Sequence, residues 1–383
     1  MKRRLLTVQG PLQYIAGYIA YSWNRPAKPD VEDILLLYDF LAAPQIEPEI
    51  ADAVRSLAVS APWTRIVFIR GEQMDALMRE RYANSMAGLR ALVGAEHVDE
   101  IYLARDHVGN GSPLLLNAYA GARKFSYGDS LGIVGQREAM DRLDRPSAVT
   151  RVRALARRLL RGAPRPIAFD EAVLSLPIDI SGKYLPTVSL AVPARDHVVA
   201  CLERIYAAVP ALGAYCHALC ELGPPGRSHL YLLSNLTASG LTDAASEAAL
   251  YAEVIRETSP VGGTVYLKPH PRSTFDVLET LARELGGDYR VHLVDDARFS
   301  RLPVELWTDL IRHCEVVAMF STSAINLKYL FDKQVVMPLD EARIARFIAP
   351  TGREHMATAS RMMREALANL ESWDGRTALW SGT

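Results

Sequence analysis

The chain alternates short apolar runs with longer segments whose apolar residues recur at helical spacing. In the first half, the apolar runs cover residues 5–9, 34–38, 65–69, 101–103 and 124–127. The segments 12–22, 47–57 and 72–92 have the length and spacing of amphipathic helices. Because strands that alternate with helices form parallel βαβ units, this half predicts a doubly wound α/β sheet.

The same alternation restarts after an arginine-rich segment. Between residues 149 and 166 the composition predicts a basic helix followed by a proline-containing linker. Further strand candidates then cover 230–233, 264–267, 291–294, 316–319 and 334–337. A chain of 383 residues exceeds the size at which one hydrophobic core usually stops growing. We therefore expect two domains, 1–165 and 166–350, and a last amphipathic helix at about 354–370 within 351–383 that packs back across their junction.

The composition excludes several classes of protein. Hydrophobic residues make up 49% and charged residues 23%, which indicates an ordered globular chain rather than a disordered one. The net charge of −1 gives no global field that would attract nucleic acid. Four cysteines without metal-ligand spacing favour a reducing compartment. Neither a signal-peptide run nor an uncharged 18-residue apolar stretch is evident, so we expect a cytoplasmic location.

Two successive α/β halves predict two facing Rossmann-like domains with a central cleft, which is the GT-B architecture of glycosyltransferases. A fold alone does not determine function, so the chemistry has to come from particular residues. In open α/β sheets the ligand binds at the carboxyl ends of the strands, so the loops that follow strands are the places to search.

One such loop reads Lys268-Pro269-His270-Pro271-Arg272 and follows the apolar run 264–267. The prolines restrict the backbone on both sides of His270 and so fix the direction of its imidazole. A histidine, with an ordinary pKa of ~6.5, can give a proton to a departing phosphate oxygen. The alternative is a structural turn in which His270 only bonds a carbonyl group.

A second loop, Ser321-Thr322-Ser323, lies between the apolar run 316–319 and a predicted helix. Free N–H groups and the positive end of the dipole at a helix N-terminus bind phosphate, and hydroxyl groups add donors. Serine and threonine are also common helix N-caps, so a purely structural role is the competing interpretation.

Two carboxylates complete the candidate chemistry. Asp129, in Gly128-Asp129-Ser130, follows the run 124–127 and could take the proton from an attacking hydroxyl group. Glu305, in Pro303-Val304-Glu305, could accept hydrogen bonds from the two hydroxyls of a ribose. The alternatives are a surface turn for Asp129 and a favourable interaction with the helix dipole for Glu305.

In this order, the loops resemble the motifs of bacterial sialyltransferases, including the alpha-2,8-polysialyltransferase family. Those enzymes carry an acidic motif ending in glycine, then a His-Pro motif, then a pair of serines. The turn Gly10-Pro11-Leu12-Gln13 also resembles their Pro-Leu-Gln loop, and the segment 303–305 resembles their ribose-binding segment. One departure concerns the first motif, because Gly128 stands in place of the first acid and Ser130 in place of the glycine.

The resemblance implies an inverting, metal-independent glycosyltransferase without a cofactor. It would move sialic acid or a related nonulosonate from a CMP-sugar to a sugar hydroxyl of a surface glycan, with polysialic acid synthesis as one form of this reaction. Asp129 would be the base and His270 the acid. The donor would be bound by a set of loop residues: Gly10, Gln13, Asn235, Lys268, Pro269, Arg272, Glu305, Ser321, Thr322 and Ser323.

The arginine-rich segment has three interpretations. Arg151, Arg157 and Arg158 could hold an anionic glycan acceptor, could contact anionic lipid as a peripheral protein of the inner membrane, or could form a solvated helix face. Nucleic acid fits poorly because no aromatic residues interleave with the arginines. The other functions left open are a Kdo or legionaminic acid transferase, a nucleotide-sugar epimerase and a non-catalytic polysaccharide-binding protein. The sequence does not identify the acceptor, the linkage or the number of sugars added.

Overall fold

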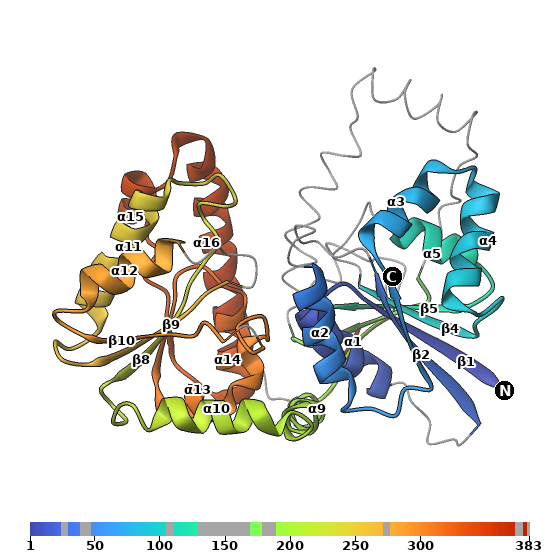
Figure 1. The fold of residues 1–383 in the computed structure, drawn as a ribbon, viewed down its shortest axis with the longest axis horizontal. Coiled ribbons are helices and arrows are strands. Elements are labelled where there is room, and N and C mark those ends of the chain that lie inside the picture. The colour runs from blue at the N-terminus through green and yellow to red at the C-terminus, as the bar shows by residue number, and fades with distance from the viewer. Residues whose placement is uncertain are drawn as a thin grey trace. The chain divides into compact units, whose positions relative to one another are not determined.

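The computed structural model describes residues 1–23, 30–38, 47–104, 111–128, 169–177, 189–270, 276–296, 298–371 and 378–380. The chain forms two compact units. Unit 1 comprises Met1–Cys201 with Asp374–Thr383, and unit 2 comprises Leu202–Trp373. Each unit contains its own sheet, as Figure 1 shows.

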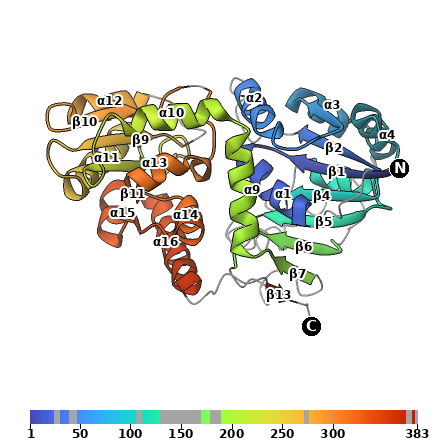
Figure 2. The same cartoon turned by 90° about the horizontal axis from the view of Figure 1, so that it is seen from below.

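The described sheet of unit 1 has the strand order β13-β7-β6-β5-β4-β1-β2-β3. All neighbouring strands are parallel except β13, which pairs antiparallel with β7 (Figure 2). The strands are β1 Lys2–Val8, β2 Val31–Tyr38, β3 Arg65–Ile69, β4 Glu100–Ala104, β5 Arg123–Gly128, β6 Glu171–Leu174, β7 Ser189–Val192 and β13 Ala378–Trp380. The central strands are buried on both faces, which explains their continuous apolar runs in the sequence.

The helices of unit 1 pack their apolar sides against this sheet. Helix α1 approaches β1 so closely that a Cβ at Gly17 would lie 2.8 Å from the Leu6 side chain, so a larger residue here would displace a buried side chain. The helices described before the boundary are α1 Pro11–Trp23, α2 Glu47–Ala58, α3 Gly71–Arg79, α4 Tyr82–Val93 and α5 Ser112–Ala118, and α9 Arg195–Ala207 runs across it.

The single helix expected over 72–92 is wrong, because two helices occupy this segment. The backbone is extended at Glu80, after which α4 begins at Tyr82. The Ser85 hydroxyl of α4 donates to the Leu77 carbonyl of α3 at 2.7 Å and so satisfies a group at the end of α3. No proline or glycine marks this break, so the sequence carried no local signal for it.

Unit 2 contains a parallel sheet of strand order β10-β9-β8-β11-β12. Helices α11 and α12 lie on one face of the sheet, and α10 and α13 lie on the other (Figure 1). The strands are β8 Ser228–Leu232, β9 Thr264–Lys268, β10 Arg290–Leu293, β11 Glu315–Ala318 and β12 Val335–Val336. The helices are α10 Pro210–Cys220, α11 Ala244–Thr258, α12 Asp276–Leu285, the 3-10 turn η1 Val304–Leu306, α13 Thr308–His313, α14 Ser323–Phe331, α15 Glu341–Phe347 and α16 Pro350–Glu371.

The boundary between the units lies later than the expected 165/166 division. Strands β6 and β7 continue the sheet of unit 1 by pairing with β5 and with each other, so unit 1 extends to Cys201. The last helix also differs from the expectation. Helix α16 packs on α14 and α15 within unit 2, and it is β13 that returns to the sheet of unit 1. The arginine-rich composition change at 149–166 therefore does not mark the domain boundary.

Candidate active site at the carboxyl edge of the second sheet

Two of the predicted loops and the loop that contains Asn235 meet at the carboxyl edge of the unit 2 sheet. The loops after β9 and β11 flank the loop after β8, because β8 lies between those two strands. The Leu233 N–H donates to the Lys268 carbonyl at 3.0 Å, and the Ser234 hydroxyl donates to the Phe320 carbonyl at 3.0 Å. The strand order also reverses direction at β8, which makes this edge a topological switch point where α/β proteins bind ligands.

His270 lies on this edge and is half-buried. It follows Pro269 directly after the end of β9. Its other neighbours in the motif, Pro271 and Arg272, lie outside the described residues. The prediction that the histidine is presented at a strand end is therefore confirmed.

The hydroxyl loop after β11 leads into α14, as the sequence predicts. The Ser321 hydroxyl oxygen accepts the Ser323 N–H at 3.3 Å, and the carbonyls of Ser321 and Thr322 accept the first helical N–H groups. All three hydroxyl residues are half-buried. The loop thus serves as a helix cap, and the N-terminus of α14 points its N–H groups toward the same edge as His270.

Lys268 lies on the opposite face of β9 from the α11 and α12 helices. Its ammonium group donates to the Ser300 carbonyl at 3.1 Å and lies 5.1 Å from the centre of the Trp307 ring. The side chain is only 4% exposed, and this burial lowers the pKa of Lys268 to about 8. The nearby Glu305 carboxylate opposes that shift, and Arg301 adds to it.

Glu305 lies in η1 and is 2% exposed. Its Oε1 accepts a hydrogen bond from the Asn326 amide of α14 at 2.6 Å. Its Oε2 is buried and has no hydrogen-bond partner among the described residues. Burying such a carboxylate oxygen costs free energy unless a hydrogen-bond donor or a positive charge lies near it. The Lys268 ammonium offsets part of that cost.

Two residues of α11 hold the β8 loop, and the sequence prediction missed both. Glu247 accepts the Leu236 N–H at 3.2 Å and the Thr237 N–H at 2.8 Å through its two carboxylate oxygens. The Tyr251 hydroxyl donates to Glu247 and accepts the Ser234 N–H at 3.0 Å. The available signal was their spacing of four residues, which places both side chains on one face of α11.

Asn235 lies between these anchored residues and is half-buried at the rim of a pocket. Burial raises the pKa of Tyr251 well above its ordinary value, and the adjacent Glu247 carboxylate acts in the same direction. Tyr251 therefore stays protonated and donates to Glu247. Because the N–H groups of Ser234 and Leu236 are both hydrogen-bonded, the backbone is held in place on both sides of Asn235.

The remaining predicted residues belong to unit 1 or lie outside the described residues. Gly10 and Gln13 are at the start of α1 in unit 1, where the Gln13 side chain accepts the Gln9 N–H at 2.8 Å. Asp129, Arg272, Arg151, Arg157 and Arg158 lie outside the described residues.

Within the described ranges, no group of three or more His, Cys, Asp and Glu side chains is arranged to hold a metal ion. No single helix in these ranges is long and apolar enough to cross a membrane. The consecutive helices α9 and α10, which are bent by 92°, satisfy the length and composition criteria only when they are taken together.

Residues 217–339 match the family model described as alpha-2,8-polysialyltransferase (POLYST). This segment contains β8, β9 and β11 and therefore the His270 and Ser321-Thr322-Ser323 loops. The resemblance predicted from the motifs is confirmed by this match. A comparison with curated proteins found no match.

Solved structures of similar fold include a Listeria monocytogenes protein provisionally assigned as a UDP-N-acetylglucosamine 2-epimerase. It is 13% identical over 98% of this chain and 91% of its own, with a TM-score of 0.52. Staphylococcus aureus MnaA with UDP is 10% identical over 97% of this chain and 91% of its own, with a TM-score of 0.51. The GT-B domain of a Photobacterium damselae sialyltransferase is 13% identical over 95% and 97% of the two chains, with a TM-score of 0.49.

The two parallel-sheet units confirm the predicted GT-B fold class. The fold therefore assigns the chain to the GT-B class of proteins. Its segment 217–339 is similar to the alpha-2,8-polysialyltransferase family.

Proposed function

We propose that the chain is an inverting glycosyltransferase that moves sialic acid or a related nonulosonate from a CMP-sugar to a hydroxyl group of a surface glycan. One observation carries the proposal. The His270 loop and the Ser321-Thr322-Ser323 loop flank a single strand at one sheet edge, within the segment that matches the polysialyltransferase family. Addition of many sugars, as in polysialic acid synthesis, is part of the same proposal.

The edge offers groups for each part of a CMP leaving group. His270 would protonate the phosphate oxygen that departs, while the Ser321 and Ser323 hydroxyls and the positive end of the α14 dipole would hold the phosphate. Glu305 would accept hydrogen bonds from the ribose hydroxyls through its Oε2, which has no other partner in the described part of the chain.

Lys268 would act on the donor through its field rather than by direct contact, because Ser300 already accepts from its buried ammonium. Arg272 would add positive charge next to His270. Asn235 and Thr322 would border the phosphate, and Pro269 would fix the backbone that presents His270.

Three parts of the proposal concern residues of other segments of the chain. By resemblance, Gly10 and Gln13 would contact the donor from unit 1, and Asp129 would be the base that takes the acceptor proton. The arginines at 151, 157 and 158 would bind an anionic acceptor. We also propose that the protein acts in the cytoplasm, at the inner membrane when it binds lipid, without a metal ion or a cofactor.

The assay is release of CMP from a CMP-sugar, with mass spectrometry of the glycan product. His270→Ala should lower kcat by about 10² to 10⁴-fold, because that is the usual contribution of general acid catalysis. Binding of CMP should weaken only modestly. Asp129→Asn should likewise abolish transfer while CMP still binds.

His355→Ala is the matched control, because it removes an exposed histidine from α16 of the same unit. A His270→Ala variant with the kcat of this control would contradict the assignment of the acid. The donor panel tests the remaining functions. Turnover of CMP-Kdo or CMP-legionaminic acid alone would identify that CMP-sugar as the donor. Turnover of UDP-N-acetylglucosamine would indicate an epimerase. Glycan binding without turnover of any nucleotide-sugar would indicate a binding protein.

A further inference from the structure

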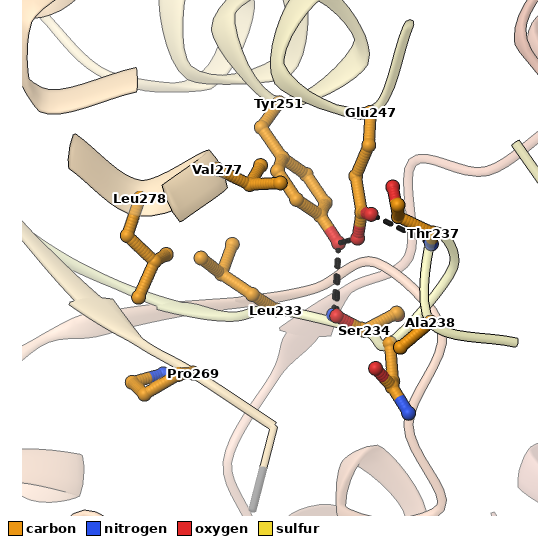
Figure 3. Close-up of a pocket in the computed structure, with 10 residues that line it drawn as sticks. Leu233, Ser234, Thr237, Ala238, Glu247, Tyr251, Pro269, Val277 and Leu278 are labelled. Atoms are coloured by element: carbon orange, nitrogen blue, oxygen red, sulfur yellow. Dashed lines mark hydrogen bonds between the residues drawn. The ribbon is translucent and has the colours of Figure 1, made fainter. Parts of the chain in front are cut away.

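A pocket of about 170 Å³ opens beside the β8 loop, between the start of α12 and the side of α11 that faces the carboxyl edge. Figure 3 shows that its two sides differ in chemistry: Glu247 and Thr237 lie on one side, and Leu278 and Pro269 lie on the opposite side. Pro269 immediately precedes His270 in the chain. The pocket is therefore adjacent to the proposed acid but lies on the other face of β9 from Lys268 and Glu305.

The polar side of the pocket has capacity left for a hydrogen-bonding ligand. The two Glu247 oxygens provide about four acceptor sites, and three are used by Leu236, Thr237 and Tyr251. Glu247 itself is only 4% exposed. One further N–H donor would complete its hydrogen bonding.

Thr237 supplies the complementary donor. Its hydroxyl oxygen is buried and has no hydrogen-bond partner among the described residues, although its backbone N–H is held by Glu247. Buried polar atoms in folded proteins are nearly always paired, so an unpaired one in the wall of a pocket points to a ligand atom or a water molecule. The hydroxyl lies beside an acceptor on Glu247, and the pair matches a ligand group with a donor and an acceptor side by side.

The apolar side restricts the ligand further. Leu233, Val277, Leu278 and Pro269 offer a surface without hydrogen-bonding side chains. A ligand group with hydroxyls on every side would lose its hydrogen bonds to water when it packs against this surface. A phosphate or carboxylate would be repelled by the Glu247 charge at low dielectric. The ligand group that fits both sides of the pocket is therefore flat and neutral, with one apolar face.

We propose that this pocket is a subsite for the cytosine base of the donor, in which the amino N–H donates to Glu247 and the adjacent ring N3 accepts from the Thr237 hydroxyl. The inference rests on the proposed function. In a CMP-sugar this chemistry lies on the aminopyrimidine edge of cytosine, where the amino group and ring N3 are adjacent. The acylamino group of the sugar does not offer it, because the N–H and carbonyl of a trans amide point to opposite sides. A carboxylate is a known partner of the cytosine amino group, which uracil lacks.

Thr237→Val tests the subsite because it keeps the branched shape and the backbone N–H but removes the hydroxyl. Thr264→Val is the matched control. The Thr264 hydroxyl is also buried and without a partner in the described ranges, but it lies at the first residue of β9, away from the carboxyl edge. The probes are CMP and UMP, measured by calorimetry, and CMP-N-acetylneuraminic acid and CMP-Kdn, measured by turnover. In CMP-Kdn a hydroxyl group replaces the acylamino group.

Thr237→Val should raise Kd for CMP by about three- to tenfold, the usual value of one hydrogen bond, and should leave Kd for UMP at the wild-type value. KM for CMP-N-acetylneuraminic acid and KM for CMP-Kdn should rise by the same factor. A rise in KM for CMP-N-acetylneuraminic acid alone would overturn the assignment of cytosine, because it would assign the acylamino group of the sugar to Thr237.

Wild-type constants for all four probes in Thr237→Val would overturn the inference, as would an equal effect of Thr264→Val. Neither result would affect the proposed function, which fails only if the wild-type protein turns over no CMP-sugar.

Discussion

Lys268 provides a test of the buried electrostatics behind the active-site edge. Its ammonium is buried against Trp307 and Ser300, and its pKa falls from 10.5 to about 8. Below pH 8 the lysine is charged in both the folded and the unfolded protein, so the folded state bears the full cost of burying the charge. Lys268→Met keeps a side chain of similar length and removes that charge.

The sign follows from proton binding. Between pH 8 and 10.5 the unfolded chain holds the Lys268 proton and the folded chain does not, so the free energy of unfolding rises with pH. The rise is about 1.4 kcal/mol per pH unit for one proton. Between pH 8 and about 9.5, Lys268 should therefore add about 2 kcal/mol to the stability of the wild-type protein, and the variant should lack this gain.

The assay is urea unfolding followed by circular dichroism, at several pH values from about 7 to 9.5, for wild type and Lys268→Met. The relevant quantity is the difference in the free energy of unfolding between the two proteins, because tyrosines and cysteines that titrate in the same range affect both. Lys333→Met, which removes a partly exposed ammonium from the same unit, is the control for loss of a lysine charge. A wild-type minus Lys268→Met difference that is flat above pH 8 would refute a lowered pKa for Lys268.

Two further predictions concern the proposed reaction. Activity should survive EDTA, because the positive charges and the α14 N-terminus stabilise the negative charge of the departing phosphate, as a metal ion would otherwise do. Loss of activity that Mg²⁺ or Mn²⁺ restores would refute the proposed metal independence. Replacing Arg151, Arg157 and Arg158 together by Gln should raise KM for long anionic acceptors and reduce its salt dependence, because each exposed ion contact contributes only ~0 to 1 kcal/mol and the effect is cumulative. An unchanged KM for the acceptor would favour a solvated helix face, and loss of vesicle binding would favour lipid contact.

The sequence predicts the strands of this fold well because most of them are buried on both faces. Runs such as 34–38 and 264–267 contain no charged residue, and the structure places β2 and β9 over them with small changes at the ends. The break between α3 and α4 depends on tertiary packing instead. A Cβ at Gly88 would lie 2.7 Å from the Leu77 side chain, so the two helices meet closely at a residue that looks unremarkable inside a helical pattern.

For the candidate site, strand ends were predictable and side-chain partners were not. His270 and Ser321 could be assigned to one edge because both follow apolar runs. Glu247 could not, because it lies in the first turn of α11, where a glutamate usually only complements the helix dipole. Its actual role depends on the β8 loop folding back to place two N–H groups on its carboxylate, which is a contact that no local pattern encodes.

Successive side chains of β9 alternate between the two faces of the sheet, so this short strand contributes to the face of α10 and α13, to the core beneath α11 and α12, and to the start of the pocket loop. Tyr266 and Lys268 point to the face of α10 and α13, where Tyr266 donates to the Leu219 carbonyl and Lys268 to that of Ser300. Val265 and Leu267 point to the opposite face and join the core beneath α11 and α12. Pro269 continues that second row and lines the pocket. Because successive residues of a strand face opposite sides, a shift of β9 by one residue would move the Lys268 charge into the apolar core and the Leu267 side chain toward Glu305. The buried contacts of this strand therefore fix its register, and the same register sets the position of His270 at the sheet edge.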